Sequence, residues 1–188
     1  MIGIIGQGFV GSAVNEKFSN FFRVLTYDID KNLSNSKKRI VQRQDVVFIC
    51  LPTPMNPDGS CHTEIVEKEL DLLNTIGIER IIVVKSTVPP GTTARWNAEY
   101  ENLNIVFNPE FLTERNAIKD YDNQKRIILG GERPATTKLK TIFSKVFPDA
   151  KVIKTDSTHA ELVKYLTNAF LSVKVSFANE MYQICEEV

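Results

Sequence analysis

The sequence has 188 residues, which is enough for one domain with a sizeable core but short for two complete domains. Its 23 basic and 23 acidic residues cancel, so no net charge attracts nucleic acid or an anionic membrane surface. The longest uninterrupted apolar run, residues 46–51, is far below the roughly 20 residues that a membrane span needs. Together with the lack of a basic, cleavable leader, this predicts a soluble, cytoplasmic protein.

The three cysteines, Cys50, Cys61 and Cys185, are far apart in the sequence. Their spacing fits no common metal-ligand pattern, and an odd number argues against a disulfide framework. We therefore expect reduced, mostly buried thiols and no metal site.

Predicted strands and helices alternate along the first 155 residues. Strands are expected at residues 1–5, 23–27, 45–51, 80–85, 104–107, 126–129 and around 152, and helices at 10–18, 63–75, 92–100 and after Pro134. Residues 115–125 are interpreted as a polar segment. Such alternation is typical of a parallel sheet with crossover helices. The predicted fold is α/β, a Rossmann-like doubly wound and mainly parallel sheet.

Residues 156–188 have a different pattern. The sequence Thr158-His159-Ala160-Glu161 resembles a capping box at a helix start. Apolar residues follow with helical spacing, at Leu162, Val163, Leu166, Phe170, Val173, Phe177, Met181 and Ile184. One long C-terminal helix is predicted, running to the end of the chain without a C-cap signal. We expect the chain to be cut within or just at the end of that helix.

The segment Gly6-Gln7-Gly8-Phe9-Val10-Gly11 has the G-x-G-x-x-G pattern and lies between the first strand and the first helix. In this pattern the first glycine allows a tight turn, the second lets a pyrophosphate approach the backbone, and the third lets the helix pack on the strand. The N–H groups of the first helical turn, including those of Phe9 and Val10, attract phosphates. The segment therefore predicts a dinucleotide site.

Asp28 stands at the end of the next strand, about twenty residues after the glycine pattern, where an acid accepts hydrogen bonds from a ribose. Its charge repels a 2′-phosphate and no arginine immediately follows, so NAD is favoured over NADP. We also assign Lys31 to the cofactor site. FAD, or a glycine turn in an unrelated α/β protein, are the alternatives that the pattern leaves open.

Four further motifs carry a resemblance to a known family. They are Val-Phe-Ile-Cys-Leu-Pro-Thr-Pro at 47–54, Lys-Ser-Thr-Val-Pro-Pro-Gly-Thr-Thr at 85–93, Asn-Pro-Glu-Phe-Leu-Thr-Glu at 108–114 and Lys-Tyr-Leu-Thr-Asn-Ala-Phe at 164–170. In these motifs and their order the sequence closely resembles the UDP-glucose/GDP-mannose dehydrogenase family. The resemblance implies an NAD-binding domain at 1–155, the start of the central dimerisation helix at 156–188, and a substrate-binding C-terminal domain that this chain lacks.

Thr53, Ser86 and Thr87 follow the ends of two predicted strands, and ligands of open α/β sheets bind beyond the carboxyl ends of strands. The resemblance implies that these three residues line the NAD site and that Thr87 also positions a catalytic water. Without the resemblance, ordinary strand-to-helix turns explain the same residue types.

Glu110 and Glu114 have a spacing that places two carboxylates on one side of a helical turn, where their acid and base roles can divide. The resemblance implies that Glu110 assists acid-base chemistry and that Glu114 contacts cofactor or substrate. It also assigns Phe111 and Leu112 to the substrate site. Exposed surface acids are the alternative, and the sequence Thr113-Glu114-Arg115 departs from the family's usual Arg-Glu-Gly.

Lys164 and Asn168 are four residues apart and so share a helix face. The resemblance implies that both contact the substrate and that Lys164 holds the negative charge developing on the sugar oxygen. Preorganised positive charge suits such a transition state. A merely solvated helix face is the alternative without the resemblance.

The family's reaction oxidises a nucleotide sugar from alcohol to acid with two NAD, through a cysteine that forms a thiohemiacetal and then a thioester. That cysteine follows the long helix in a glycine-rich segment, and none of the three cysteines here matches it. We therefore expect NAD binding without efficient sugar oxidation by this chain alone. UDP-glucose is the favoured substrate and GDP-mannose the alternative.

Two other classes remain open: a naturally short, non-catalytic NAD-binding protein, and a β-hydroxyacid dehydrogenase sharing the Rossmann half and a helix lysine. The Glu110 and Glu114 motif argues against the latter. The resemblance further implies synthesis of polysaccharide precursors and a homodimer packed around the long helix. We expect the apolar stripe from Leu166 to Ile184 to pack on a partner or to be left exposed.

Overall fold

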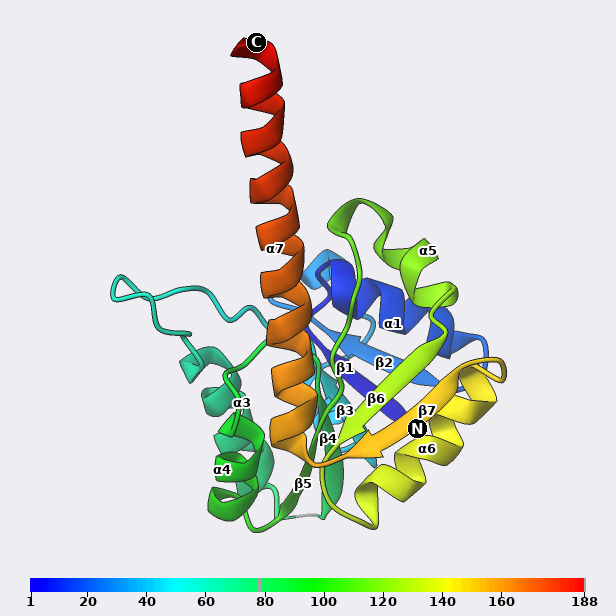
Figure 1. Ribbon diagram of the computed structural model, residues 1–188. Helices are drawn as coiled ribbons and strands as arrows, with labels where there is room; N and C mark the ends of the chain where they lie inside the picture. Colours follow the sequence, from blue (N-terminus) through cyan, green and yellow to red (C-terminus); the bar gives the residue numbers. More distant parts are fainter. Residues whose placement is uncertain (78, 188) are drawn as a thin grey trace.

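The structure is a computed structural model that describes residues 1–77 and 79–187 (Figure 1). The strands are β1 (Ile2–Ile5), β2 (Val24–Tyr27), β3 (Val46–Ile49), β4 (Arg80–Val84), β5 (Leu103–Phe107), β6 (Arg126–Gly130) and β7 (Lys151–Thr155). The helices are α1 (Phe9–Ser19), α2 (Lys38–Val41), α3 (Glu64–Thr75), α4 (Thr92–Glu99), α5 (Ala117–Asp122), α6 (Ala135–Val146) and α7 (Ser157–Glu187), with short 3₁₀ turns η1 (Lys31–Leu33) and η2 (Glu114–Asn116).

The seven strands form one sheet in the order β2-β1-β3-β4-β5-β6-β7. Strands β1 to β5 are parallel, whereas β6 pairs antiparallel with β5 and parallel with β7. The last two strands therefore run against the first five. Phe107, Gly130 and Thr155, the last residues of β5, β6 and β7, lie in one row of the sheet, so α7 starts level with the carboxyl end of β5.

Helices cover both faces of the sheet, and each face has its own apolar core. One core joins α1 and α6 to the sheet through Phe18, Phe48 and Phe143, whose rings meet edge to face. The other core joins α3 and α4 to the opposite face and includes Leu70 and the fully buried Trp96. The central strands β1, β3 and β4 are buried throughout, as expected for a parallel sheet covered on both faces. The predicted doubly wound α/β fold is confirmed.

The polar segment of residues 115–125, where no helix was predicted, contains part of η2 and all of α5. The helix has one narrow apolar edge, formed by the buried residues Ala117 and Tyr121. Tyr121 packs its ring against Phe147 at 5.3 Å between centroids. Six helical residues with two buried positions are too few to give a clear periodic signal.

The capping box predicted at Thr158 is wrong. Helix α7 begins at Ser157, and Asp156 caps it: its Oδ1 accepts a hydrogen bond from the His159 N–H at 2.9 Å. Glu161, the expected partner of Thr158, is fully buried and bonds to α4 instead. The prediction failed because Glu161 makes a tertiary contact with α4 instead of a local capping bond within α7.

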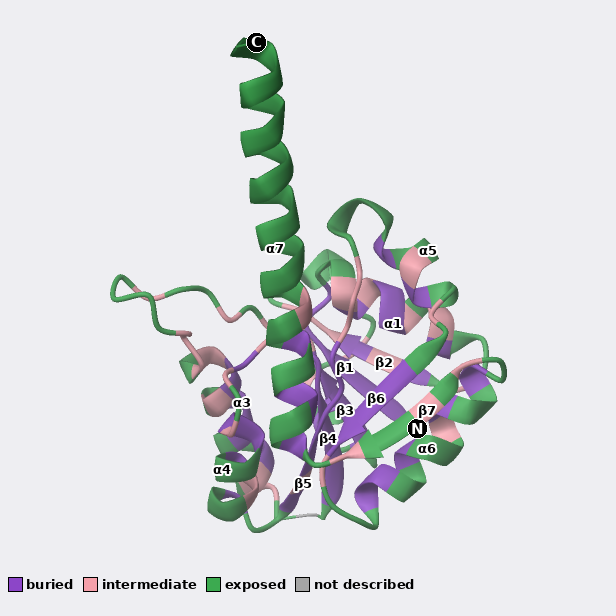
Figure 2. Cartoon of the chain, viewed as in Figure 1, coloured by how far each residue is buried: buried purple, intermediate pink, exposed green. Residues whose placement is uncertain are grey.

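Helix α7 packs on the sheet only through its first two turns and then projects away from the domain (Figure 1). Its buried residues are Ser157, Ala160, Glu161 and Lys164, and its described residues after Thr167 are all exposed (Figure 2). The last predicted residue of this helix, 188, lies outside the described residues. In the part of the chain that the structure describes, no helix, α7 included, combines the length and apolar character of a membrane span.

Candidate functional site

The glycine segment forms a tight turn between β1 and α1. A Cβ at Gly11 would collide with the backbone oxygen of Gly6, and one at Gly6, where φ is +90°, would collide with that of Cys50. Gly8 differs, because no described atom beyond its own chain neighbours lies within 4 Å of where its Cβ would stand. Gly6 and Gly11 are therefore required by packing, whereas open space at Gly8 leaves room for a ligand.

Helix α1 presents its N-terminus to that open space. Gly8 is the N-cap residue, and no side chain of the described residues caps the helix. The first turn contains no acidic residue, and Phe9 is largely exposed. The N–H groups of the first turn, where Phe9 and Val10 lie, therefore suit an anionic group. This geometry fits the pyrophosphate of a dinucleotide.

Asp28 follows β2 and holds the glycine turn in place. Its Oδ2 accepts a hydrogen bond from the Gln7 N–H at 2.6 Å, and its Oδ1 accepts one from the Asp30 N–H at 2.9 Å. Each carboxylate oxygen keeps a second lone pair for a ribose hydroxyl. Lys31 begins the following 3₁₀ turn with an exposed side chain.

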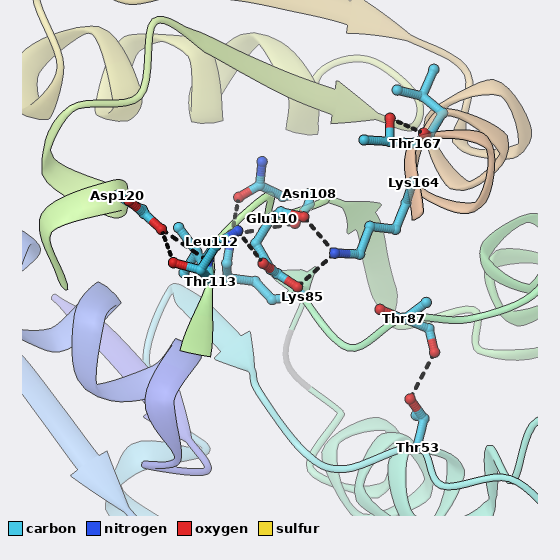
Figure 3. Close-up of polar contacts among 11 residues, drawn as sticks. Thr53, Lys85, Thr87, Asn108, Glu110, Leu112, Thr113, Asp120, Lys164 and Thr167 are labelled. Atoms are coloured by element: carbon cyan, nitrogen blue, oxygen red, sulfur yellow. Dashed lines mark hydrogen bonds and ion pairs between the residues drawn. The ribbon is translucent and has the colours of Figure 1, made fainter. Parts of the chain in front are cut away.

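Two hydroxyl groups join the segments that follow β3 and β4. Thr53 Oγ1 donates to the backbone oxygen of Thr87 at 2.7 Å, and Ser86 Oγ donates to that of Leu51 at 2.6 Å. Figure 3 shows the contact between Thr53 and Thr87. The residues that we predicted at the ends of two separate strands therefore meet. The hydroxyl oxygens of Thr53 and Ser86 can still accept a hydrogen bond from a ligand.

Lys164 of α7 points toward Glu110, which follows β5 (Figure 3). Its Nζ lies 2.7 Å from Glu110 Oε1 and 2.7 Å from the Glu110 backbone oxygen. The two side chains are only 6% and 10% exposed, so this is a buried ion pair. A charge held in such a site interacts strongly with any ligand that replaces the present partner.

The helical turn predicted to align Glu110 with Glu114 is absent, because residues 108–113 form an irregular segment and η2 begins only at Glu114. Glu110 Oε2 accepts from the Leu112 N–H at 2.7 Å, whereas Glu114 is exposed and lines a groove with Phe9 and Ser12 of α1. The two acids thus have different surroundings. Glu114 lies beside the glycine turn and Glu110 beside Lys164.

The other predicted substrate residues surround the ion pair unevenly. The Phe111 ring lies under the Lys164 ammonium at 5.7 Å and under the Arg126 guanidinium at 5.5 Å. Leu112 is half-buried and packs against the core. Asn168, one turn after Lys164, is exposed.

Lys85 is a buried basic residue whose role the sequence analysis missed. Its Nζ donates to Asn108 Oδ1 at 2.9 Å (Figure 3). The same Nζ lies 5.4 Å from the centre of the Tyr121 ring. Within residues 1–77 and 79–187 no carboxylate forms an ion pair with it. Burial lowers the pKa of Lys85 to about 8, although the fields of Cys50 and Glu110 oppose that shift. The sequence did offer a signal for Lys85, because it stands directly before Ser86 at the end of a strand.

None of the three cysteines is placed as an active nucleophile. Burial raises the pKa of Cys50 to about 12, and burial also raises the pKa of Cys61, whose Sγ lies 3.7 Å from the Thr87 backbone oxygen. Cys185 is exposed on α7, about 30 Å along the helix axis from Lys164. In the described chain, no group of three His, Cys, Asp or Glu side chains is arranged to hold a metal ion.

The glycine turn follows β1, which lies between β2 and β3 in the sheet, and Asp28 after β2 bonds to that turn. This arrangement defines a dinucleotide-binding domain. Residues 30–148 match the NAD binding domain of the UDP-glucose/GDP-mannose dehydrogenase family, and residues 158–188 match its central domain. The first match alone covers more than half of the chain. The chain therefore belongs to the UDP-glucose/GDP-mannose dehydrogenase family, and NAD is confirmed as the cofactor of this domain.

Similar proteins include named members of this family. A UDP-glucose 6-dehydrogenase of Bacillus subtilis is 35% identical over 173 residues, which are 87% of this chain and 39% of the relative. A UDP-glucose dehydrogenase structure from Pyrobaculum islandicum is 31% identical with a TM-score of 0.83, over 96% of this chain and 51% of that one. A GDP-mannose dehydrogenase structure from Pseudomonas aeruginosa is 25% identical with a TM-score of 0.81, over 95% and 51%. The chain thus spans well under half of the curated relative and about half of each solved chain.

Proposed function

We propose that this chain is the NAD-binding part of an enzyme that oxidises UDP-glucose to UDP-glucuronate with two NAD. The observation that carries the proposal is the buried Lys164 ammonium, 2.7 Å from Glu110 and beyond the end of β5. Such an ammonium stabilises negative charge on a sugar oxygen as a hydride leaves the carbon. The division of the chain into residues 1–155 and 156–188 is part of this proposal.

The cofactor, when bound, accepts the hydride, and the residues of this chain orient it. Gly6, Gly8, Gly11 and the start of α1 bind its pyrophosphate, with Phe9 and Val10 supplying part of the first turn. Asp28 binds the ribose, and Lys31 lies beside it. Thr53, Ser86 and Thr87 line the nicotinamide side, and Glu114 closes the groove next to α1.

Substrate binding is assigned to the segment around the ion pair. Glu110 holds the Lys164 ammonium and exchanges a proton with a water that Thr87 positions. Phe111, Leu112 and Asn168 border the same space. The departures from the usual family sequence at residues 113–115 lie on the cofactor side, because Glu114 faces α1 and the Thr113 N–H donates to Asp120 Oδ2 at 2.9 Å.

NAD binding is tested first, by calorimetric titration of the chain with NAD and NADP. We expect Asp28→Ala to weaken NAD binding about tenfold or more, because a charge-assisted hydrogen bond to ribose is lost. Glu16→Ala, which removes an exposed acid from α1, serves as the matched control and should bind like the wild type. Equal affinity of the wild type for NAD and NADP would contradict the assigned role of Asp28.

Sugar oxidation is tested by NADH absorbance with UDP-glucose and, in parallel, GDP-mannose. GDP-mannose is the second candidate substrate because of the similarity to the Pseudomonas aeruginosa structure. We expect no repeated turnover by this chain, since desolvation raises the pKa of Cys50 and of Cys61, and Cys185 lies far from Lys164. Repeated turnover would show that the reaction does not need the cysteine that we infer.

We also propose that the chain forms a homodimer through the exposed apolar stripe of α7. Phe170, Val173 and Phe177 are each more than 60% exposed, which is unusual for large apolar residues on one helix. We further propose that the protein is cytoplasmic and takes part in the synthesis of polysaccharide precursors. Light scattering that shows a strict monomer at high concentration would contradict the dimer.

A further inference from the structure

Glu161 is a fully buried acid that the proposed chemistry does not use. Its Oε2 accepts a hydrogen bond from the Gly91 N–H at 2.6 Å, and its Oε1 accepts one from the Thr93 N–H at 2.8 Å. The donors belong to the start of α4, 70 and 68 residues earlier in the chain. One carboxylate on α7 therefore caps a different helix.

Helix α4 depends on this cap. Its N-cap residue is Gly91, which has no side chain to satisfy the first N–H groups, and its first turn contains no acidic residue. Helix N-terminal N–H groups carry a partial positive charge and have no partner inside the helix. The Glu161 carboxylate supplies both acceptors and a negative charge at this place.

The position of Glu161 connects two parts of the candidate site. The segment before Gly91 contains Ser86 and Thr87, which follow β4. Lys164, three residues after Glu161 on the same helix face, bonds to Glu110 beyond β5. One turn of α7 thus contacts both segments.

We propose that Glu161 is a positioning residue that holds the segment of residues 86–91 against α7, so that Ser86 and Thr87 keep a fixed place relative to the Lys164 ammonium. This inference rests on the proposed function only in assigning Ser86 and Thr87 to the cofactor. The hydrogen bonds and the shared helix turn are independent of that assignment.

The test compares Glu161→Gln and Glu161→Ala with Glu180→Gln, which alters an exposed acid on the same helix. A glutamine has one acceptor oxygen and two donor hydrogens, so it satisfies only one of the two N–H groups. We expect hydrogen exchange at the Gly91 and Thr93 amides to rise about tenfold or more in Glu161→Gln. The amides of β4 should keep their wild-type protection, which shows that the sheet remains folded.

Two further measurements separate positioning from capping alone. Reductive methylation of Lys164, followed by mass spectrometry and referred to the exposed Lys174, should become about threefold faster or more as the α7 turn loosens. NAD affinity should fall by about threefold to tenfold, because the weakened charged hydrogen bonds no longer hold Ser86 and Thr87 in place. Glu180→Gln should change none of these values.

Unchanged exchange at Gly91 and Thr93 would overturn the inference. An equal rise in hydrogen exchange at the β4 amides would also overturn it. So would a rise in exchange limited to Gly91 and Thr93 while the Lys164 methylation rate and the NAD affinity stay at their wild-type values. If the wild type itself fails to bind NAD, the proposed function fails instead. The exchange and methylation results then still decide whether Glu161 couples the two segments.

Discussion

The buried pair of Lys164 and Glu110 should stabilise the fold, and a double-mutant cycle measures by how much. Lys164→Met leaves the Glu110 carboxylate buried, with the Leu112 N–H as its one remaining partner among the described residues. Breaking a buried pair in this way costs about 3 to 5 kcal/mol. Glu110→Gln should cost less, about 1 to 2 kcal/mol, since the ammonium keeps the Glu110 backbone oxygen and an amide oxygen as acceptors.

The assay is urea unfolding followed by the fluorescence of Trp96, the only tryptophan, which is fully buried. The double variant should lose less free energy of unfolding than the sum of the single variants, by about 1 to 3 kcal/mol. Lys174→Met, at an exposed lysine on the same helix, is the control and should stay within about 0.5 kcal/mol of the wild type. Single variants as stable as this control, or strictly additive losses, would refute the reasoning that burial makes this pair strong.

Three more predictions concern other parts of the molecule. Gly8→Ala should weaken NAD binding at unchanged thermal stability, whereas Gly11→Ala should lower the melting temperature. The reason is that a Cβ at Gly11 collides with backbone and one at Gly8 does not. Equal melting temperatures of the two variants would contradict this difference. Burial lowers the pKa of Lys85 to about 8 from 10.5, so between these values the unfolded state binds more protons and stability rises with pH. Lys85→Met removes that rise, and the difference in unfolding free energy, wild type minus variant, should grow by about 1 kcal/mol from about pH 7 to about pH 9; a constant difference in urea titrations would count against the shifted lysine. Phe170→Glu should shift light scattering toward monomer, and an unchanged mass would place the interface elsewhere.

Much of the candidate cofactor site could be predicted from sequence because its residues are set by short-range geometry. The glycine turn, the acid after β2 and the residues that follow β3 and β4 all occupy strand ends, and parallel strands bring such ends together. The contact between Thr53 and Thr87 follows from that rule. The helical alignment of Glu110 and Glu114 failed because spacing alone does not reveal whether a segment is helical.

The sequence by itself determined the alternating strands and helices, the glycine turn and the family, because these depend on local periodicity and short motifs. Only the tertiary structure decided how α7 meets the sheet. The antiparallel pairing of β6 with β5 through Gly130 and Phe107 places the start of α7 beside the carboxyl end of β5, and hydrophobic periodicity does not encode strand direction. From there, α7 brings Glu161 to α4 and Lys164 to Glu110 across 70 and 54 residues of sequence. Contacts of such separation exist only once the whole sheet has formed, so no local pattern reports them.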